Sequence, residues 1–113
     1  MTILDSPISS SDLSALASHI YGEMIKAVAD IDRGVLALDA ELHSDLERML
    51  LEDGSDQESL WGFNLYPEED GEDFIEFDSL INIRPRQGNM SRDVENKDAR
   101  NAICRIVDKY IQR

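Results

Sequence analysis

The sharpest chemical pattern in the sequence is Glu41-x-His43-x-Asp45, in which two carboxylates flank an imidazole at every second position. On a strand the three side chains would point to one side, because successive side chains alternate between faces. An imidazole between carboxylates can bind a divalent metal ion or act as a general base. A divalent metal is therefore the one cofactor that the sequence suggests. A solvated surface is the favoured alternative, since such combinations arise by chance in so acidic a segment.

A second pattern gathers amide and guanidinium side chains just after a predicted strand. Its members are Asn82, Arg84, Arg86, Gln87, Asn89 and Arg92. Guanidinium groups bind carboxylates and phosphates through paired hydrogen bonds, so this segment could hold an anion or contact a partner. The favoured interpretation is that its arginines pair with the acidic middle of the same chain.

The dipeptide Trp61-Gly62 is the third feature. A single Trp in an alternating strand is usually part of the core. A Gly beside it leaves room for another backbone or a ligand to approach closely. Cys104, the only cysteine, is expected to be a partly buried structural thiol.

Charge is segregated along the 113 residues, which carry a net charge of −13. Residues 39–78 hold fifteen acids and one base, whereas residues 79–113 hold eight bases and four acids. So acidic a chain should be repelled by nucleic acids and anionic membranes. Solubility alone is the favoured explanation of this acidity. If the charge has a further role, we expect a protein partner with a basic surface that docks on residues 39–78, and the module could also be a homodimer.

Two absences bear on the cellular location. No apolar run approaches the roughly 20 residues of a membrane helix, and residues 1–11 lack the features of a signal peptide. A single cysteine cannot form an internal disulfide bond, which is typical of a reducing compartment. The expected location is the cytoplasm.

The elements that must position these residues follow from the hydrophobic pattern. Residues 1–8 are predicted to form a flexible arm before a single domain over residues 9–113. Ser9 and Asp12 resemble a capping box that starts a helix reaching Tyr21, and Asn96 starts a second helix. Alternating patterns predict strands at residues 24–31, 35–38, 60–66 and 74–84, with an acidic loop at residues 67–73. Residues 40–52 fit a helix or a strand.

One apolar stripe on each helix and one apolar face on each strand predict an α+β fold. We expect an antiparallel β-meander of four to five strands, with the N-terminal and C-terminal helices packed on one face as a two-layer sandwich. The inner face of the last strand would carry Ile75, Phe77, Ile81 and Ile83. The outer face would stay in water and carry Asn64, Tyr66, Glu76, Asp78, Asn82 and Arg84.

Several stretches resemble a family of small bacterial proteins catalogued as domain of unknown function five-six-seven-four. They are IKAVADIDRGVLAL, ELHSDLERMLLEDGS, QESLWGFNLYP, FIEFDSLINIRPRQGNMSR and VENKDARNAICRIVDKYI, and the resemblance covers about Tyr21 to Ile111. It implies a shared site at Glu41, His43, Asp45, Trp61, Asn82, Arg84, Gln87 and Asn89. It also favours a strand at residues 47–52. Relatives often carry glycines where Asp39-Ala40 stand in this chain.

The resemblance implies no activity, and the sequence alone does not identify one. Nucleotide-binding, Cys-x-x-Cys and nucleophile-elbow motifs are missing. We therefore favour a non-enzymatic binding or regulatory module and leave an enzyme as the alternative. That alternative is a small metal-assisted hydrolase or lyase with Glu41, His43 and Asp45 as ligands or base and Arg84 as anion clamp.

Overall fold

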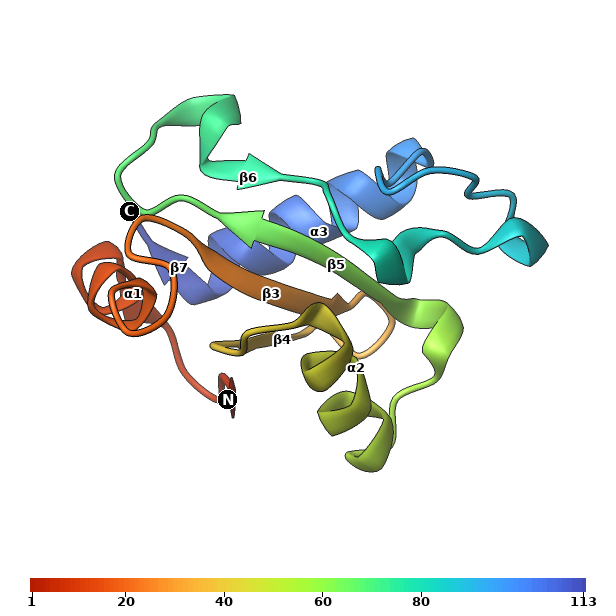
Figure 1. Cartoon of the computed structure of the whole chain (residues 1–113), viewed down its shortest axis with the longest axis horizontal. Helices are drawn as coiled ribbons and strands as arrows, with labels where there is room; N and C mark the ends of the chain where they lie inside the picture. The colour runs from red at the N-terminus through yellow and green to blue at the C-terminus, as the bar shows by residue number, and fades with distance from the viewer.

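A five-stranded antiparallel sheet forms the centre of the molecule in the computed structural model, which describes residues 1–113 (Figure 1). In spatial order the strands are β1 (Thr2–Ile3), β4 (Val35–Leu38), β3 (Ile25–Asp30), β5 (Leu60–Leu65) and β6 (Ile75–Glu76). The predicted α+β class is confirmed, but the sheet is not a simple meander. β5 pairs with β3 and not with β4, because the helix α2 (His43–Glu52) carries the chain across the sheet between them.

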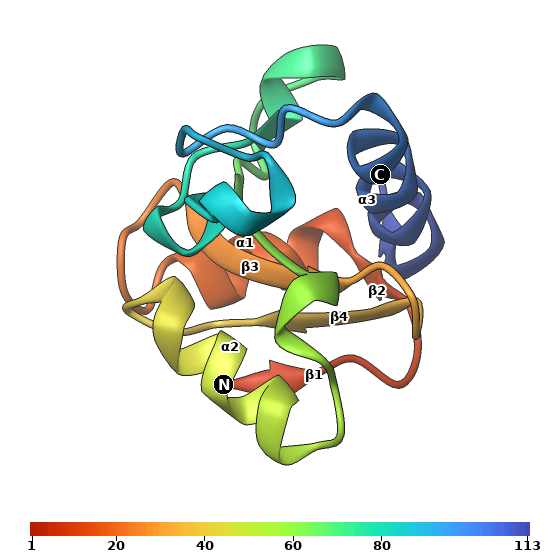
Figure 2. The same ribbon diagram turned by 90° about the vertical axis from the view of Figure 1, so that its right-hand side faces the viewer.

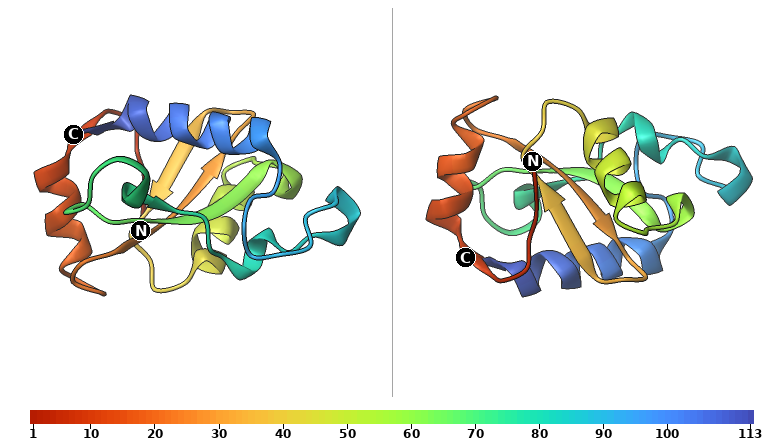
Figure 3. Two further views of the ribbon diagram at one scale, coloured as in Figure 1. Left: turned by 90° about the horizontal axis from the view of Figure 1, so that it is seen from above. Right: turned by 90° about the horizontal axis from the view of Figure 1, so that it is seen from below.

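Helices cover both faces of the sheet, so the predicted two-layer sandwich is wrong in this respect. The helices α1 (Ser10–Ala17) and α3 (Lys97–Tyr110) contribute to one large apolar core, as expected, while α2 packs on the opposite face (Figures 2 and 3). Side chains of β5 alternate between the two cores. Trp61 and Phe63 belong to the α1–α3 side, and Leu60 belongs to the α2 side.

Residues 43–52 form a helix, so the strand that the family resemblance favoured at residues 47–52 is wrong. Leu46 and Leu50 are fully buried one helical turn apart, and burial of this stripe against the sheet selects the helix. The turn before α2 places Asp39 at φ 76°, in the left-handed region that glycine adopts most readily. A glycine at this position would therefore be free of the strain that a side chain introduces.

The predicted strand at residues 74–84 ends after two residues. Beyond it the chain forms short 3-10 turns at Leu80–Asn82 and Pro85–Gln87. The four apolar side chains expected on one face therefore separate. Ile75 and Phe77 pack on the α1–α3 core and Ile81 on the α2 core, whereas Ile83 is exposed. Further 3-10 turns lie at Gln57–Ser59 and Gly71–Phe74.

Residues 1–8, predicted as a flexible arm, contribute β1 and the start of β2 (Ile8–Ser9). β2 pairs in parallel with β7 (Ile111–Gln112) in a separate two-stranded sheet. The capping box of Ser9 and Asp12 starts α1 as predicted, and the Asn96 side chain caps α3 by accepting a hydrogen bond from Ala99 N–H. None of the helices combines the length and the apolar character that a membrane crossing requires.

Candidate functional site

The Asn82 side chain occupies the place of a missing strand beside β5. Beyond Asn64 the outer edge of β5 has no backbone partner. There the Asn82 Oδ1 atom accepts from Gly62 N–H at 2.8 Å, and Asn82 Nδ2 donates to the Gly62 carbonyl at 2.9 Å. Asn82 is completely buried, which corrects the expectation that it faces water. Its amide reproduces the two hydrogen bonds of a ladder pair and closes the edge.

Arg84 continues the same closure one step along the edge. Its guanidinium donates to the carbonyl groups of Gln57 and Leu60, and it lies 4.2 Å from the centroid of the Trp61 ring. Burial lowers the pKa of Arg84 below its usual value, although Glu47 opposes this shift. Arg84 therefore uses both terminal nitrogens and its flat face within the fold, although its buried Nε has no hydrogen-bond partner, and it is not a free anion clamp.

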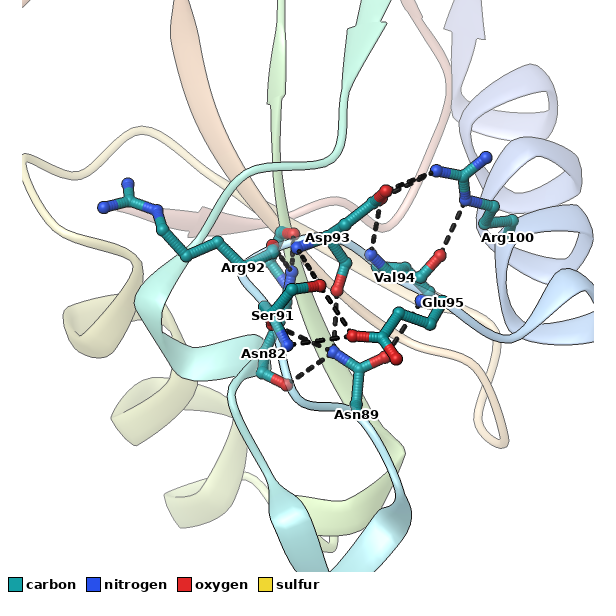
Figure 4. A network of polar contacts seen from close by, with 9 residues as sticks. Asn82, Asn89, Ser91, Arg92, Asp93, Val94, Glu95 and Arg100 are labelled. Carbon is teal, nitrogen blue, oxygen red and sulfur yellow. Dashed lines mark hydrogen bonds and ion pairs between the residues drawn. The ribbon is translucent and has the colours of Figure 1, made fainter.

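The Asn89 side chain forms hydrogen bonds that hold together the loop after Asn82 (Figure 4). Its Nδ2 atom donates to the carbonyls of Asn82, Ser91 and Asp93, and its Oδ1 atom accepts from Glu95 N–H at 2.9 Å. All capacity of this buried amide is thus used inside the protein. Gln87 likewise donates to the Glu58 carbonyl.

The surrounding arginines of this loop pair within the chain. Arg92 contacts Asp78 at 2.5 Å, and Arg100 contacts Asp93 at 2.7 Å. The Arg92–Asp78 pair joins the basic last third of the chain to its acidic middle, as the sequence interpretation favoured. The Arg100–Asp93 pair lies within the last third itself (Figure 4).

His43 is buried beneath α2 and is not a surface ligand. Its Nε2 atom donates to the Phe63 carbonyl at 2.7 Å, because a carbonyl can only accept. Burial lowers the pKa of His43 to about 4, and the charge of Lys26 adds to this effect. The imidazole is therefore neutral at pH 7 and fixes the start of α2 to β5.

This burial makes a testable prediction about acid sensitivity. The pKa of His43 is about 4 in the folded chain and about 6.5 when unfolded. Between these values the unfolded state binds more protons, so stability falls as the pH drops from 6.5 towards 4. We expect a loss of about 2 kcal/mol between pH 7 and pH 5, measured by urea denaturation. The variant His43→Gln should lose this dependence, whereas His19→Gln should keep it. Equal slopes in the two variants would contradict the assignment.

Glu41, His43 and Asp45 do not form a ligand set. Glu41 is exposed, and Asp45 pairs with Arg48 at 3.1 Å. No group of three or more His, Cys, Asp or Glu side chains in the chain is arranged to hold a metal ion. The ligand set required the strand alternative for residues 40–52, but α2 begins at His43, so Glu41 lies before the helix and His43 and Asp45 point to different sides of it.

The eight candidate residues also do not share a cleft. His43 lines one hollow with Lys26 and Arg92, of about 220 Å³. Arg84 lines a second hollow, and Trp61 lines a third, of about 490 Å³; Gln87 borders both, and Asn89 borders the third. The five candidate residues that form hydrogen bonds inside the fold are His43, Asn82, Arg84, Gln87 and Asn89. These residues therefore stabilise the fold, and none of these hollows is lined by both His43 and Arg84.

The most prominent ionic feature lies elsewhere, in the acidic loop of residues 67–73. Glu69, Asp70, Glu72 and Asp73 are exposed, and their carboxylates have neither an ion pair nor a side-chain hydrogen bond. Sequence reasoning placed a docking surface broadly over residues 39–78 and did not single out this loop. The run of five acids within six residues was the available signal.

Two hollows flank β6 beside this loop. We name the first the acidic hollow; it measures about 430 Å³ and is lined by Tyr66, Glu69, Glu72, Asp73, Ile75 and Glu76. We name the second the β6–α3 groove; it measures about 620 Å³ and is lined by Gly71, Glu72, Ile75, Phe77, Arg100, Asn101, Cys104, Asp108 and Arg113. Glu76 accepts from Tyr66 Oη at 3.0 Å, and burial together with this bond raises the pKa of Tyr66.

Comparison with known proteins identifies a family and nothing beyond it. The model of DUF5674, described as "Protein of unknown function", matches residues 2–110. No curated protein and no solved structure matches the chain. The match spans nearly the whole sequence, and the chain therefore belongs to the DUF5674 family of proteins of unknown function.

Proposed function

We propose that this protein is a non-enzymatic binding module that receives a basic protein partner on the acidic loop. The observation that carries the proposal is the set of exposed carboxylates on Glu69, Asp70, Glu72 and Asp73, which no cation of the chain neutralises. Other acids in the same third of the sequence do have partners. Asp53 pairs with Arg33 at 2.7 Å, for example.

Concentrating unpaired like charges costs free energy through repulsion, and a cationic partner would relieve that cost. Arg113 lies beside the end of the loop, 4.2 Å from the centroid of the Phe74 ring, but it already pairs with Asp108. The negative electrostatic potential at the loop can therefore attract a cation from another molecule. Such a field accelerates encounter with basic surfaces and repels nucleic acids.

The alternative enzyme receives no support from the geometry. Its proposed ligands, Glu41, His43 and Asp45, are directed to different environments, and Arg84 is occupied by backbone carbonyls and Trp61. The candidate residues of the sequence motif are better explained by the closure of β5. Binding at the acidic loop does not require any of them.

The test measures the affinity for a short lysine-rich peptide by calorimetry at low salt. Replacing Glu69, Glu72 and Asp73 by Gln, Gln and Asn should weaken binding about 10- to 100-fold, since each exposed ion pair contributes up to about 1 kcal/mol. The matched control removes three exposed carboxylates elsewhere, through Glu41→Gln, Glu52→Gln and Asp56→Asn. It should change the affinity less than about twofold. Equal losses in both triple variants would show attraction by net charge only and would refute a docking site.

A further inference from the structure

The outer edge of β6 carries backbone groups without partners. Tyr66 N–H donates to the Phe74 carbonyl, and the register pairs Asn64 with Glu76. Hydrogen-bonded and non-hydrogen-bonded pairs alternate along an antiparallel ladder. Phe74 and Glu76 therefore direct their N–H and C=O groups towards β5, whereas Ile75 directs both of its groups away from it. The strand ends after Glu76, because Asp78 N–H donates to the Glu76 carbonyl and closes a tight turn around Phe77. No strand follows β6 in the sheet.

The rest of this side of the sheet is closed. Asn82 and Arg84 occupy the edge of β5 beyond β6 with side-chain hydrogen bonds. At the opposite edge of the sheet, β1 borders none of the five hollows described above. The β6 edge is thus the one place where unpaired backbone groups coincide with flanking space for side chains.

We propose that β6 accepts an extended basic segment of the partner protein as an additional antiparallel or parallel strand. This inference rests on the proposed function above and specifies how the partner is held. Strand addition obtains affinity from main-chain hydrogen bonds and specificity from alternate side chains. The free N–H and C=O groups of Ile75 can form one hydrogen-bonded pair with the added strand.

The two hollows predict the side-chain pattern of the added strand. A residue opposite Ile75 points to the same face as Ile75, which is the face of the β6–α3 groove. There it meets the apolar surface of Phe77 and Cys104, while Arg100 and Arg113 are already paired with Asp93 and Asp108. An apolar residue fits this position.

The neighbouring residues of the added strand point to the other face, where Glu76 lies. That side carries the acidic hollow, whose four carboxylates have no cationic partner. Lys or Arg fits here, and its alkyl chain can lie against Tyr66. The segment therefore alternates basic and apolar residues.

A second copy of this chain is a poor occupant. Pairing of β6 with β6 would bring two sets of the same carboxylates, those of Glu69, Glu72 and Asp73, to one seam. Like charges opposed across an interface are strongly unfavourable. The charge thus selects a basic partner over self-association, and the protein should remain monomeric when it is concentrated.

The test compares peptides, so the fold of the protein is never altered. The probe is a short peptide of alternating lysine and valine, and its matched control has the same composition with lysines and valines in separate blocks. We expect the alternating peptide to bind about tenfold tighter. Methylation of the alternating peptide at the backbone nitrogens that would face β6 removes their N–H donors. It should weaken binding about tenfold, since each net hydrogen bond contributes about 1 kcal/mol.

Amide hydrogen exchange locates the contact directly. On addition of the alternating peptide, exchange at Ile75 should slow at least about tenfold, while the amide of Glu76, already paired with β5, changes little. If the peptides bind through the acidic loop but the methylated form binds equally well, strand addition is wrong and the acidic docking site stands. If no basic peptide binds, both proposals fail. Dimerisation through β6 would also overturn this inference.

Discussion

Replacement of Asn82 by alanine is expected to destabilise the fold by about 4 kcal/mol. The change removes both hydrogen bonds to Gly62 and the bond from Nδ2 to the Arg92 carbonyl at 3.0 Å. Gly62 is itself buried, so its N–H and C=O groups would lose their partners without gaining water. Denaturation in urea, followed by circular dichroism, measures the effect.

Two further variants separate the causes of this loss. Asn82→Leu fills nearly the same volume but cannot pair with Gly62, so it should be destabilised to a similar degree. Asn101→Ala removes an exposed asparagine from α3 and should change stability by less than about 0.5 kcal/mol. A leucine variant within about 1 kcal/mol of the parent would mean that packing, and not edge closure, explains Asn82.

The substitution Gly62→Ala should destabilise the protein by about 3 kcal/mol. A Cβ atom on Gly62 would lie 2.6 Å from Ser79 Oγ and 2.8 Å from Ser79 Cβ, well inside van der Waals contact. Ser79 is 1% exposed and is fixed by a hydrogen bond from its N–H to the Arg92 carbonyl, so it cannot move aside easily. The measurement is again urea denaturation.

A double-mutant cycle provides the control for this clash. Ser79→Gly removes the two nearest atoms that the new methyl group would meet and leaves only Ile81 Cγ1, at 3.1 Å. The pair Gly62→Ala with Ser79→Gly should therefore be more stable than additivity predicts, by about 2 kcal/mol. Additive losses would show that Gly62 is required for another reason. The glycine of the Trp61-Gly62 pair is thus explained by a close approach, as the sequence suggested, but the approaching group is the protein itself.

The sequence predicted the helix starts and the three central strands best. The Ser9–Asp12 capping box, the Asn96 cap and the strands β3, β4 and β5 all occur as expected. Capping residues and short apolar or alternating runs suffice there, even though the three strands are buried on both faces. The same reasoning failed at residues 74–84, since the alternation continues beyond Phe77 while the buried Ser79 turns the chain into a 3-10 turn.

For the candidate site, the sequence correctly grouped three residues of one loop, but it did not predict that they stabilise the fold. Asn82 and Asn89 do lie close together in one loop (Figure 4). Arg84 joins them through backbone hydrogen bonds with Asn89. Their hydrogen bonds go to backbone carbonyls and amides, and no pattern of residue types reveals those partners. His43 was interpreted as an exposed metal ligand or base for a related reason. The helical turn that buries it depends on the packing of Leu46 and Leu50 against the sheet, which the sequence pattern does not show.

The parallel pairing of β2 with β7 has a consequence for the order of folding during synthesis. Ile8 and Ile111 are more than a hundred residues apart in the chain. β2 leads directly into α1, so the first helix to leave the ribosome lacks this strand pair until Ile111 has emerged. The β3–β4 hairpin, with local contacts, can form early in the nascent chain, and β1 can pair with β4 at that stage. The β2–β7 pair, which joins the two ends of the chain, must therefore form late.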